Sequence, residues 1–523
     1  MYNFIVCVYS QKMEVSITNG KITTKLAFYQ SLPTFFHFPP IVFFAKQVDS
    51  VGKSLFLRTN INKLLLPSMN ELNDFFATLS GYLWSWPTIV LLLGTHIYLT
   101  VRLRFPQRHI LKALKLSITP DKGSSGDVSQ FGALATALAA TIGTGNIVGV
   151  ATAVALGGPG SVLWCWLTGV FGMATKYGES LLAVKYRVRT PEGKMAGGPM
   201  YALEKGLGWK RLAILFALFT VIASLGIGNT VQANAIAALV EKTYSVSPYI
   251  TGLIVAVLTG VVIVGGVNSI AKVCEWVVPI MALLYIVGCG YVLWHHADYV
   301  MPAIEKICSS AFSPQAMGGG FVGSTILIAA RFGIARGLFS NESGLGSASI
   351  AAAAAQTRNP VRQALVASTG TFWDTVVICA VTGIVLVSCI MADPTINYSD
   401  GAELANMAFG DIPVIGKPLL SFGMFTFAFT TILGWCYYGE RSVEYLRGGI
   451  TTHIYRWVFI VFVFLGSIIN LELVWSISDC TNALMAIPNL IAVILLCGVI
   501  VRETRTYLWE NRLDAPMPPE PEE

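Results

Sequence analysis

The stretch Ala139-Ala-Thr-Ile-Gly-Thr-Gly-Asn-Ile-Val-Gly149 places poor helix-forming residues in the middle of a long apolar segment. Glycine and asparagine disfavour a helix interior, so the Gly-x-Gly-Asn within it predicts a local interruption. Unwound backbone at membrane depth is tolerated only where it lines protein or a wet cavity. An interruption of the helix here would expose backbone N–H groups that favour a carboxylate, and backbone carbonyl groups that suit an ammonium group or Na⁺. Alternatively, these small residues only let two helices pack closely.

The whole chain has the composition of a membrane protein. Of its 523 residues, 54% are hydrophobic and only 12% are charged, and the mean hydropathy is +0.63. Soluble globular proteins carry about 25% charged residues, so a soluble enzyme, a nucleic-acid-binding domain and a disordered protein are excluded. We expect an all-α polytopic membrane protein with eleven transmembrane helices, at 83–101, 129–156, 160–184, 212–240, 250–268, 273–294, 318–355, 367–391, 416–439, 457–474 and 480–501.

The basic residues predict the orientation of these helices. Lys and Arg concentrate in cytoplasmic loops, and alternate loops of the eleven-helix arrangement hold 24 basic residues against 3. This pattern predicts an N-terminus outside the cell and a cytoplasmic C-terminus. We expect a multi-pass protein of the plasma membrane, which is the inner membrane in a bacterium.

A second interruption lies five spans after the first, at Arg331-Phe-Gly-Ile-Ala-Arg-Gly-Leu-Phe-Ser-Asn-Glu-Ser-Gly-Leu-Gly346. Two sets of five spans that each open with a broken helix indicate an inverted repeat, as in many secondary transporters. Arg336 and Glu342 form either a cytoplasmic gate pair or a solvated face at the helix end. The expected organisation is an N-terminal extension, a first span with its cytoplasmic loop, two five-helix repeats and a cytoplasmic tail, at 1–68, 69–128, 129–294, 318–501 and 502–523.

Polar residues inside the apolar segments are the remaining candidates for function. Thr430 and Thr431 could complete an oxygen cage for Na⁺ with backbone carbonyls, or they could bond the carbonyls of their own helix. Five other side chains are either functional or hold helices together: Asn229, Gln232, Asn234, Asp374 and Asp479. The chain has no HExxH motif, no Ser/His/Asp arrangement and no phosphate-binding loop. We therefore expect neither catalytic residues nor a cofactor.

Taken together, these motifs resemble the alanine or glycine:cation symporter family, also called the sodium:alanine symporters. The resemblance covers about 69–505 and also includes Lys176-Tyr-Gly-Glu179, Gly197-Gly-Pro-Met-Tyr201, Gly228-Asn-Thr-Val-Gln-Ala-Asn234 and Met485-Ala-Ile-Pro-Asn-Leu490. It implies the leucine-transporter-type fold, with five helices plus five inverted helices after one extra span. It also implies sodium-driven uptake of alanine or glycine, with no nucleic acid and no obligatory protein partner.

The resemblance also implies a role for individual residues. Backbone N–H groups of Gly143, Thr144 and Gly145 would hold the substrate carboxylate, with Thr141 and Asn146 beside it. Phe332 would be an aromatic gate, and Gln232 and Trp373 would be pocket walls. Sodium would be bound by carbonyl groups and two hydroxyls, from Ala139, Ile142, Phe427, Thr430 and Thr431.

Three rival functions remain open. A proton-coupled symporter on the same fold needs a titratable group near the membrane midplane, for which Asp374 is the obvious candidate. A membrane-embedded enzyme needs paired carboxylates or a histidine cluster at matching depth, which the sequence lacks. A channel or a substrate-sensing receptor differs from a symporter because it does not accumulate substrate.

The first 68 residues are expected to be an upstream extension, with Met69 as the physiological start. They lack a long apolar run and the order of regions of a signal peptide, whereas Met69 opens a short amphipathic lead into the first span. Mass spectrometry of the native N-terminus should therefore find no peptide from residues 21–60. Detection of such a peptide would show that the extension is made.

Overall fold

The structure is a computed structural model in which the chain divides into two compact units, Met1–Ser68 and Met69–Glu523. It describes residues 3–8, 11–18, 21–26, 71–121, 124–312, 326–396, 401–410, 416–469 and 472–517. The first unit holds an antiparallel sheet in which β2 (Gln11–Thr18) lies between β1 (Asn3–Val8) and β3 (Lys21–Leu26). The sequence between β2 and β3 is Asn-Gly, which is the strongest short hairpin signal.

The second unit is a helical bundle with one short hairpin of β4 (Val188–Arg189) and β5 (Met195–Ala196) among its described residues. Described helices overlap each of the eleven apolar segments, and residues 318–325 of the seventh segment lie outside the described residues. The helices are α2 (Trp86–Arg102), α3 (Ile110–Ser117), α4 (Gln130–Thr141), α5 (Val150–Gly157), α6 (Gly160–Lys185), α7 (Pro199–Tyr201), α8 (Lys210–Leu225), α9 (Val231–Tyr244), α10 (Pro248–Val264), α11 (Gly266–His295), α12 (Ala297–Ser310), α13 (Ile326–Asn341), α14 (Ser347–Ala353), α15 (Pro360–Thr371), α16 (Ala380–Ala392), α17 (Gly401–Gly410), α18 (Gly416–Arg447), α19 (Ile450–Ile468), α20 (Glu472–Leu495) and α21 (Cys497–Thr504).

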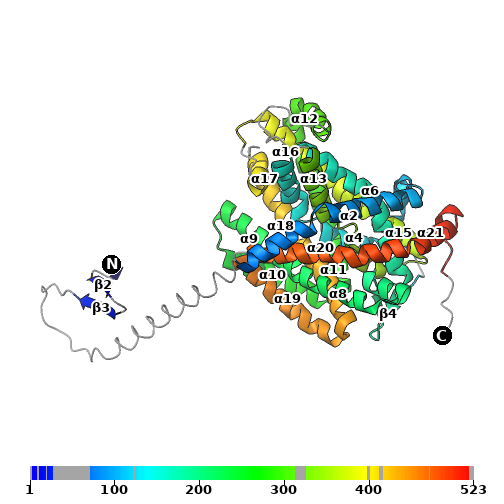
Figure 1. Ribbon diagram of the computed structural model, residues 1–523, viewed down its shortest axis with the longest axis horizontal. Coiled ribbons are helices and arrows are strands. Elements are labelled where there is room, and N and C mark those ends of the chain that lie inside the picture. Colours follow the sequence, from blue (N-terminus) through cyan, green and yellow to red (C-terminus); the bar gives the residue numbers. More distant parts are fainter. Residues whose placement is uncertain are drawn as a thin grey trace. The chain divides into compact units, whose positions relative to one another are not determined.

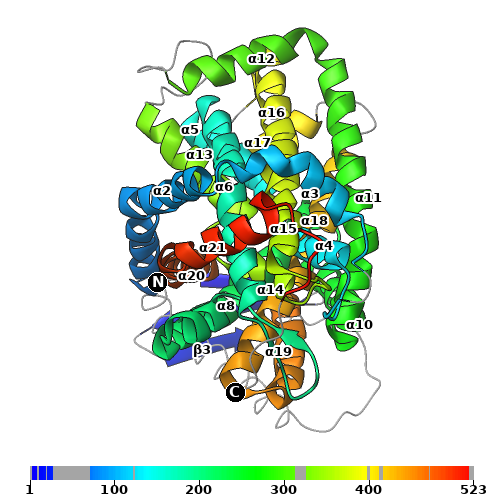
Figure 2. The same ribbon diagram turned by 90° about the vertical axis from the view of Figure 1, so that its right-hand side faces the viewer.

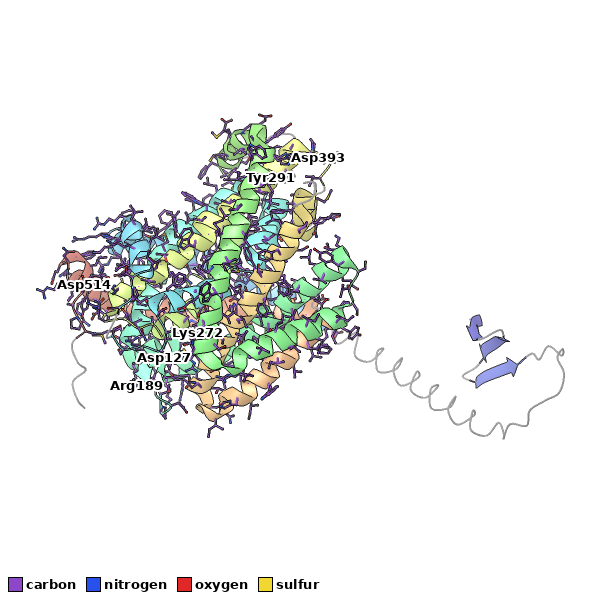
Figure 3. All side chains as sticks on the ribbon, turned by 180° about the vertical axis from the view of Figure 1, so that it is seen from behind. Asp127, Arg189, Lys272, Tyr291, Asp393 and Asp514 are labelled. Carbon is purple, nitrogen blue, oxygen red and sulfur yellow. The ribbon has the colours of Figure 1, made fainter. Side chains whose placement is uncertain are left out.

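Six described helices are long and apolar enough to cross a membrane, and up to eight spans result if each of two bent pairs counts as one. The predicted number of eleven spans stays a prediction. Figure 3 shows Asp127, Arg189 and Lys272 toward one end of the bundle and Tyr291 and Asp393 toward the opposite end. The orientation read from the basic residues stays a prediction.

The first break is the interruption at residues 142–144, between α4 and the segment that begins at Gly145. The two segments, Gln130–Thr141 and Gly145–Gly157, are bent by 54° relative to each other. The alanine-rich α4 begins at Ser129, whose hydroxyl accepts a hydrogen bond from the Gly132 N–H at 2.8 Å. It ends at Ile142, which adopts an extended conformation. The predicted interruption of this helix is confirmed.

The second break is the link Glu342–Gly346 between α13 and α14. Gly344 and Gly346 have φ values of +94° and +82°, which glycine adopts without steric cost. Glu342 also has a positive φ, of 54°, which is uncommon for a residue with a Cβ. Backbone strain of this kind concentrates at functional sites, so the second break is also a candidate for function.

Helices from the two halves of the bundle pack on each other around the breaks. α13 packs against α5 and α6, and α4 packs against α18 (Figures 1 and 2). Three π-helical turns occur in the polar stretches inside the spans: η2 (Gly145–Gly149), η4 (Gly226–Thr230) and η5 (Phe372–Cys379). Such turns are frequent at functional sites, and η2 and η5 contact each other.

Candidate functional site

A small cavity of about 20 Å³ lies where the two breaks meet. A space of this size holds about one water molecule. Both breaks and four further helical elements contribute to its lining, which consists of Ala140, Thr141, Gly143, Gly145, Ile227, Gln232, Phe339, Ser340, Glu342, Thr431, Trp435 and Asn482. Half of these lining residues are polar or charged, and the others are apolar, aromatic or glycine.

A large cavity of about 630 Å³ lies next to the small cavity and shares two lining residues with it, Gly145 and Phe339. A Cβ atom placed on Gly145 would be 3.3 Å from the ring of Phe339. The ring thus packs directly on the first break, and Phe339 and Gly145 form the wall between the two cavities.

Asn146 ties the first break to the second half of the bundle. Its side-chain oxygen accepts a hydrogen bond from the Gly143 N–H at 2.8 Å, and its amide donates to the Asp374 carboxylate at 2.7 Å. The other carboxylate oxygen of Asp374 accepts from Ser340 at 2.9 Å and from Thr375 at 2.6 Å. The break is therefore held by a fully buried polar network, and the Gly143 N–H is not free for a ligand.

The broken end of α4 also meets α18. The hydroxyl of Thr431 lies 3.4 Å from the Ile142 carbonyl oxygen and 2.9 Å from that of Phe427. The Thr430 hydroxyl also lies near the Phe427 carbonyl, at 3.1 Å, but its other neighbours are the Thr426 carbonyl at 2.9 Å and the sulfur of Met281 at 3.5 Å. Two carbonyl groups and one hydroxyl thus converge at Thr431. Oxygen atoms of this kind are the ligands that hard cations prefer.

The second break is held in the same manner by a buried carboxylate. One carboxylate oxygen of Glu179 accepts from the Gly344 N–H at 2.8 Å and from the Asn489 amide at 2.5 Å. The Asn489 amide also donates to the Gly344 carbonyl at 2.8 Å. Both backbone groups of Gly344 therefore have side-chain partners.

Two acceptor atoms beside the small cavity are unpaired. The side-chain oxygens of Gln232 and Asn482 are buried and have no hydrogen-bond partner in the described part of the chain. A buried polar atom without a partner costs free energy, and ligand sites are one place where such atoms are found. The Gln232 oxygen lies 3.6 Å from the position of a Cβ on Gly143, which places it beside the first break.

Most of the residues named from the sequence lie at this site. Thr141, Gly143, Gly145 and Gln232 line the small cavity, and Thr144 lines the large cavity. Ala139, Ile142 and Phe427 are buried, as the sodium hypothesis requires.

Phe332 and Trp373 line neither of these two cavities. Phe332 packs against Gly157, and Trp373 exposes 37% of its surface, which does not fit the wall of an enclosed pocket. Phe339 and Trp435 line the small cavity instead of Phe332 and Trp373. Phe339 lies two helical turns after Phe332 and directly before the second break. Trp435 lies one turn after Thr431.

Arg336 and Glu342 do not form a pair. Arg336 lines the large cavity together with Lys242 and Glu403, whereas the Glu342 carboxylate accepts a hydrogen bond from Ser347 at 2.6 Å. The suggested cytoplasmic gate pair is therefore wrong. Asn229 and Asn234 hold helices together, because their amides donate to carbonyl groups of Phe459 and Gly466 on α19.

A polytopic helical bundle with two broken helices around a polar cavity is the architecture of a secondary transporter. Residues 69–518 match the sodium:alanine symporter family, and the chain belongs to that family. Members of this family are transporters, so the protein is a multi-pass membrane transporter and not an enzyme.

Individual relatives agree with this assignment. The chain is 49% identical over 438 residues to the sodium/alanine symporter AgcS of Methanococcus maripaludis, covering 82% of this chain and 96% of AgcS. It is 34% identical over 455 residues to the putative sodium/proton-dependent alanine carrier protein YrbD of Bacillus subtilis, covering 83% of this chain and 92% of YrbD. The structure also matches the crystal structure of MhsT in complex with L-phenylalanine, with a TM-score of 0.51 and 13% identity. The match covers 74% of this chain and 95% of the MhsT chain. This match confirms the leucine-transporter-type fold.

Proposed function

We propose that the protein imports alanine or glycine together with Na⁺ across the plasma membrane by alternating access, with its C-terminus in the cytoplasm. The main support is the small cavity at the meeting point of two broken helices, separated by Phe339 from a large cavity. The two repeats, 129–294 and 318–501, would move relative to each other to expose the small cavity to one side at a time.

The substrate would bind with its charged ends on opposite walls of the small cavity. The helix that starts at Gly145 has N–H groups without partners inside the helix, as every helix start does, and these would hold the carboxylate together with the helix dipole. The unpaired side-chain oxygens of Gln232 and Asn482 would accept hydrogen bonds from the ammonium group. A small side chain is required because Phe339 and Trp435 enclose the remaining space.

Sodium would bind where the end of α4 meets α18, with Thr431 and the carbonyl groups of Ile142 and Phe427 as ligands, completed by Ala139 and Thr430. The Thr431 hydroxyl already lies between two of these carbonyls. Gly143 would allow the substrate and the ion to bind next to each other, because a Cβ there would collide with the Thr431 hydroxyl. Binding of Na⁺ at its position would therefore help to order the residues that bind the substrate, and binding of the substrate would help to order the sodium ligands.

Proton coupling is the second candidate, and the name of the relative YrbD includes it. The geometry around Asp374 favours sodium. Its two carboxylate oxygens accept from three side chains, Asn146, Ser340 and Thr375. Three hydrogen-bond donors stabilise the ionised form of a carboxylate. A carboxyl group that carries a proton during transport must also be stable in its protonated form.

Uptake of labelled alanine into proteoliposomes distinguishes these functions. An inward Na⁺ gradient should drive accumulation at constant pH, and a pH gradient alone should not. With one Na⁺ per substrate, a tenfold gradient and about 100 mV should support at most roughly 500-fold accumulation. Uptake that ignores Na⁺ and follows pH would establish the proton-coupled alternative, and uptake without accumulation would indicate a channel.

The sodium position predicts unequal effects of two neighbouring substitutions. Thr431→Val removes a hydroxyl that touches both carbonyls, and the loss of about 1 kcal/mol should raise the Na⁺ concentration for half-maximal uptake roughly fivefold. Thr430→Val should have a smaller effect, because that hydroxyl lies near only one of the two carbonyls, that of Phe427, and otherwise contacts Thr426 and Met281. Both values come from uptake measured against Na⁺ concentration. Equal Na⁺ dependence in the two variants would place the ion elsewhere.

The substrate position predicts a role for the unpaired oxygen of Asn482. Asn482→Leu keeps the size of the side chain but removes the acceptor, and should weaken alanine binding at saturating Na⁺ by about tenfold or more, because a hydrogen bond to a charged group is lost. Thr481→Val is the matched control, because the Thr481 hydroxyl bonds the Ile477 carbonyl of its own helix at 3.0 Å. Equilibrium binding of labelled alanine measures both. Normal affinity in Asn482→Leu would contradict this placement of the ammonium group.

A further inference from the structure

Backbone hydrogen bonds join the two broken helices at one end of the bundle. The Asp127 N–H, just before the first broken helix, donates to the Ala354 carbonyl, just after the second, at 2.8 Å. The Gln356 N–H donates to the Val128 carbonyl, also at 2.8 Å, and the resulting parallel bridge pairs Val128 with Ala355. In the proposed function this end faces the cytoplasm. A substrate in the small cavity can leave toward that side only when the bridge opens.

The residues next to this bridge fix the start of α15. The Asp121 carboxylate is buried and accepts hydrogen bonds from the backbone N–H of Arg358 at 2.9 Å and from its Nε at 2.6 Å. The Asn359 side-chain oxygen caps α15 by accepting from the Arg362 N–H at 2.9 Å. α15 continues through η5 into α16 as one long apolar helix, which carries Asp374. The position of α15 is therefore linked to the first break through the hydrogen bonds of Asp374.

The segment Leu513–Met517, which we call the strap, is bound to the same residues. The Asn359 amide, whose oxygen caps α15, donates to two carbonyl groups of the strap at 2.7 and 3.0 Å. The Arg358 guanidinium donates to the carbonyl between them at 3.0 Å. The last residue of the strap donates its N–H to the Arg358 carbonyl at 2.7 Å. Two adjacent residues beside the bridge thus hold four backbone groups of the strap.

The side chains of the strap add one buried contact and one exposed contact. Leu513 is the one fully buried residue of the strap, and it belongs to an apolar cluster that includes Val361 and Leu365 of α15. The Asp514 carboxylate lies 2.9 Å from a guanidinium nitrogen of Arg362, but 84% of the Asp514 side chain is exposed. Exposed ion pairs contribute little to stability, because water and salt screen them. A segment attached in this way can detach and reattach while the bundle stays folded.

We propose that the strap is a releasable latch on the cytoplasmic exit: while attached, it holds α15 in place and keeps the bridge closed, and it detaches before the small cavity opens to the cytoplasm. This inference rests on the proposed function, because it assigns the strap to one step of alternating access. Attachment of the strap stabilises the closed bridge, so the loss of a strap contact shifts the equilibrium toward the open bridge by the same factor. Residues of the bridge then contact water more often.

Labelling of a cysteine placed at the bridge measures this equilibrium. Ala355→Cys replaces a side chain that is buried in the closed bridge, and a water-soluble maleimide labels it only when the bridge opens. In the solubilised full chain, Leu513→Ser should raise the labelling rate tenfold or more, because a buried apolar side chain is lost. Asp514→Asn should raise the rate about threefold, as expected for one exposed ion pair. Glu510→Gln is the matched control and should leave the rate unchanged, because this exposed acidic side chain pairs with Arg512 rather than with α15.

A second reporter separates opening of the bridge from a general loosening of the bundle. Ala311→Cys replaces an equally buried side chain. Ala311 lies against Gly160, at the opposite end of the first broken span from Val128. Its labelling should stay unchanged in both strap variants. The labelling of the chain without an added cysteine is subtracted in every case.

Two outcomes would overturn the proposal. Unchanged labelling of Ala355→Cys in both strap variants would show that the strap does not hold the bridge. An equal rise in the labelling of Ala311→Cys would show that the strap supports the whole bundle rather than the bridge. Failure of the proposed function is distinguishable, because the wild type would then not accumulate alanine, whereas the labelling measurement requires neither alanine nor Na⁺.

Discussion

Main-chain polar groups at membrane depth need partners, and this requirement determines how the two broken helices are built. Each break leaves N–H and carbonyl groups that water cannot reach. At the first break, the Asn146 side chain satisfies the Gly143 N–H. At the second, Glu179 and Asn489 satisfy both backbone groups of Gly344. The backbone can therefore stay unwound without being exposed to lipid.

The side chains that hydrogen-bond the backbone at the first break also link the two halves of the bundle. Asn146 belongs to the first broken helix, but its amide bonds Asp374, whose carboxylate also bonds Ser340 on α13. A displacement of α13 thus acts on the first break through two hydrogen bonds. The alternating access that we propose would require such a connection, because a break that moved independently would open the small cavity to both sides and let the ion gradient leak.

The sequence predicted the elements far better than the positions on them. Both breaks were predicted, because glycine and polar residues seldom occur together inside an apolar run unless the helix is interrupted there. The aromatic pocket walls were not predicted correctly. Phe332 and Phe339 lie on the same helix, and only Phe339 lies next to the second break. The two phenylalanines have the same hydropathy, so the hydropathy pattern cannot tell which of them lies next to the break. Asn482 was missed for a different reason: a single asparagine in an apolar helix gives no sign of facing a cavity.

The difference in size between the two cavities has a mechanistic consequence. The small cavity holds about one water molecule, so an amino acid enters only if its walls separate. The ring of Phe339 packs on Gly145, which has no side chain to keep it away. The closed wall is thus stabilised by contact with the first break, whose N–H groups we propose to bind the substrate carboxylate. A substrate that enters replaces this contact with its own, which offsets the cost of opening. A molecule too large to let the ring return leaves the wall open and cannot be occluded. Size selection would then act at closure, through Phe339, rather than at first contact.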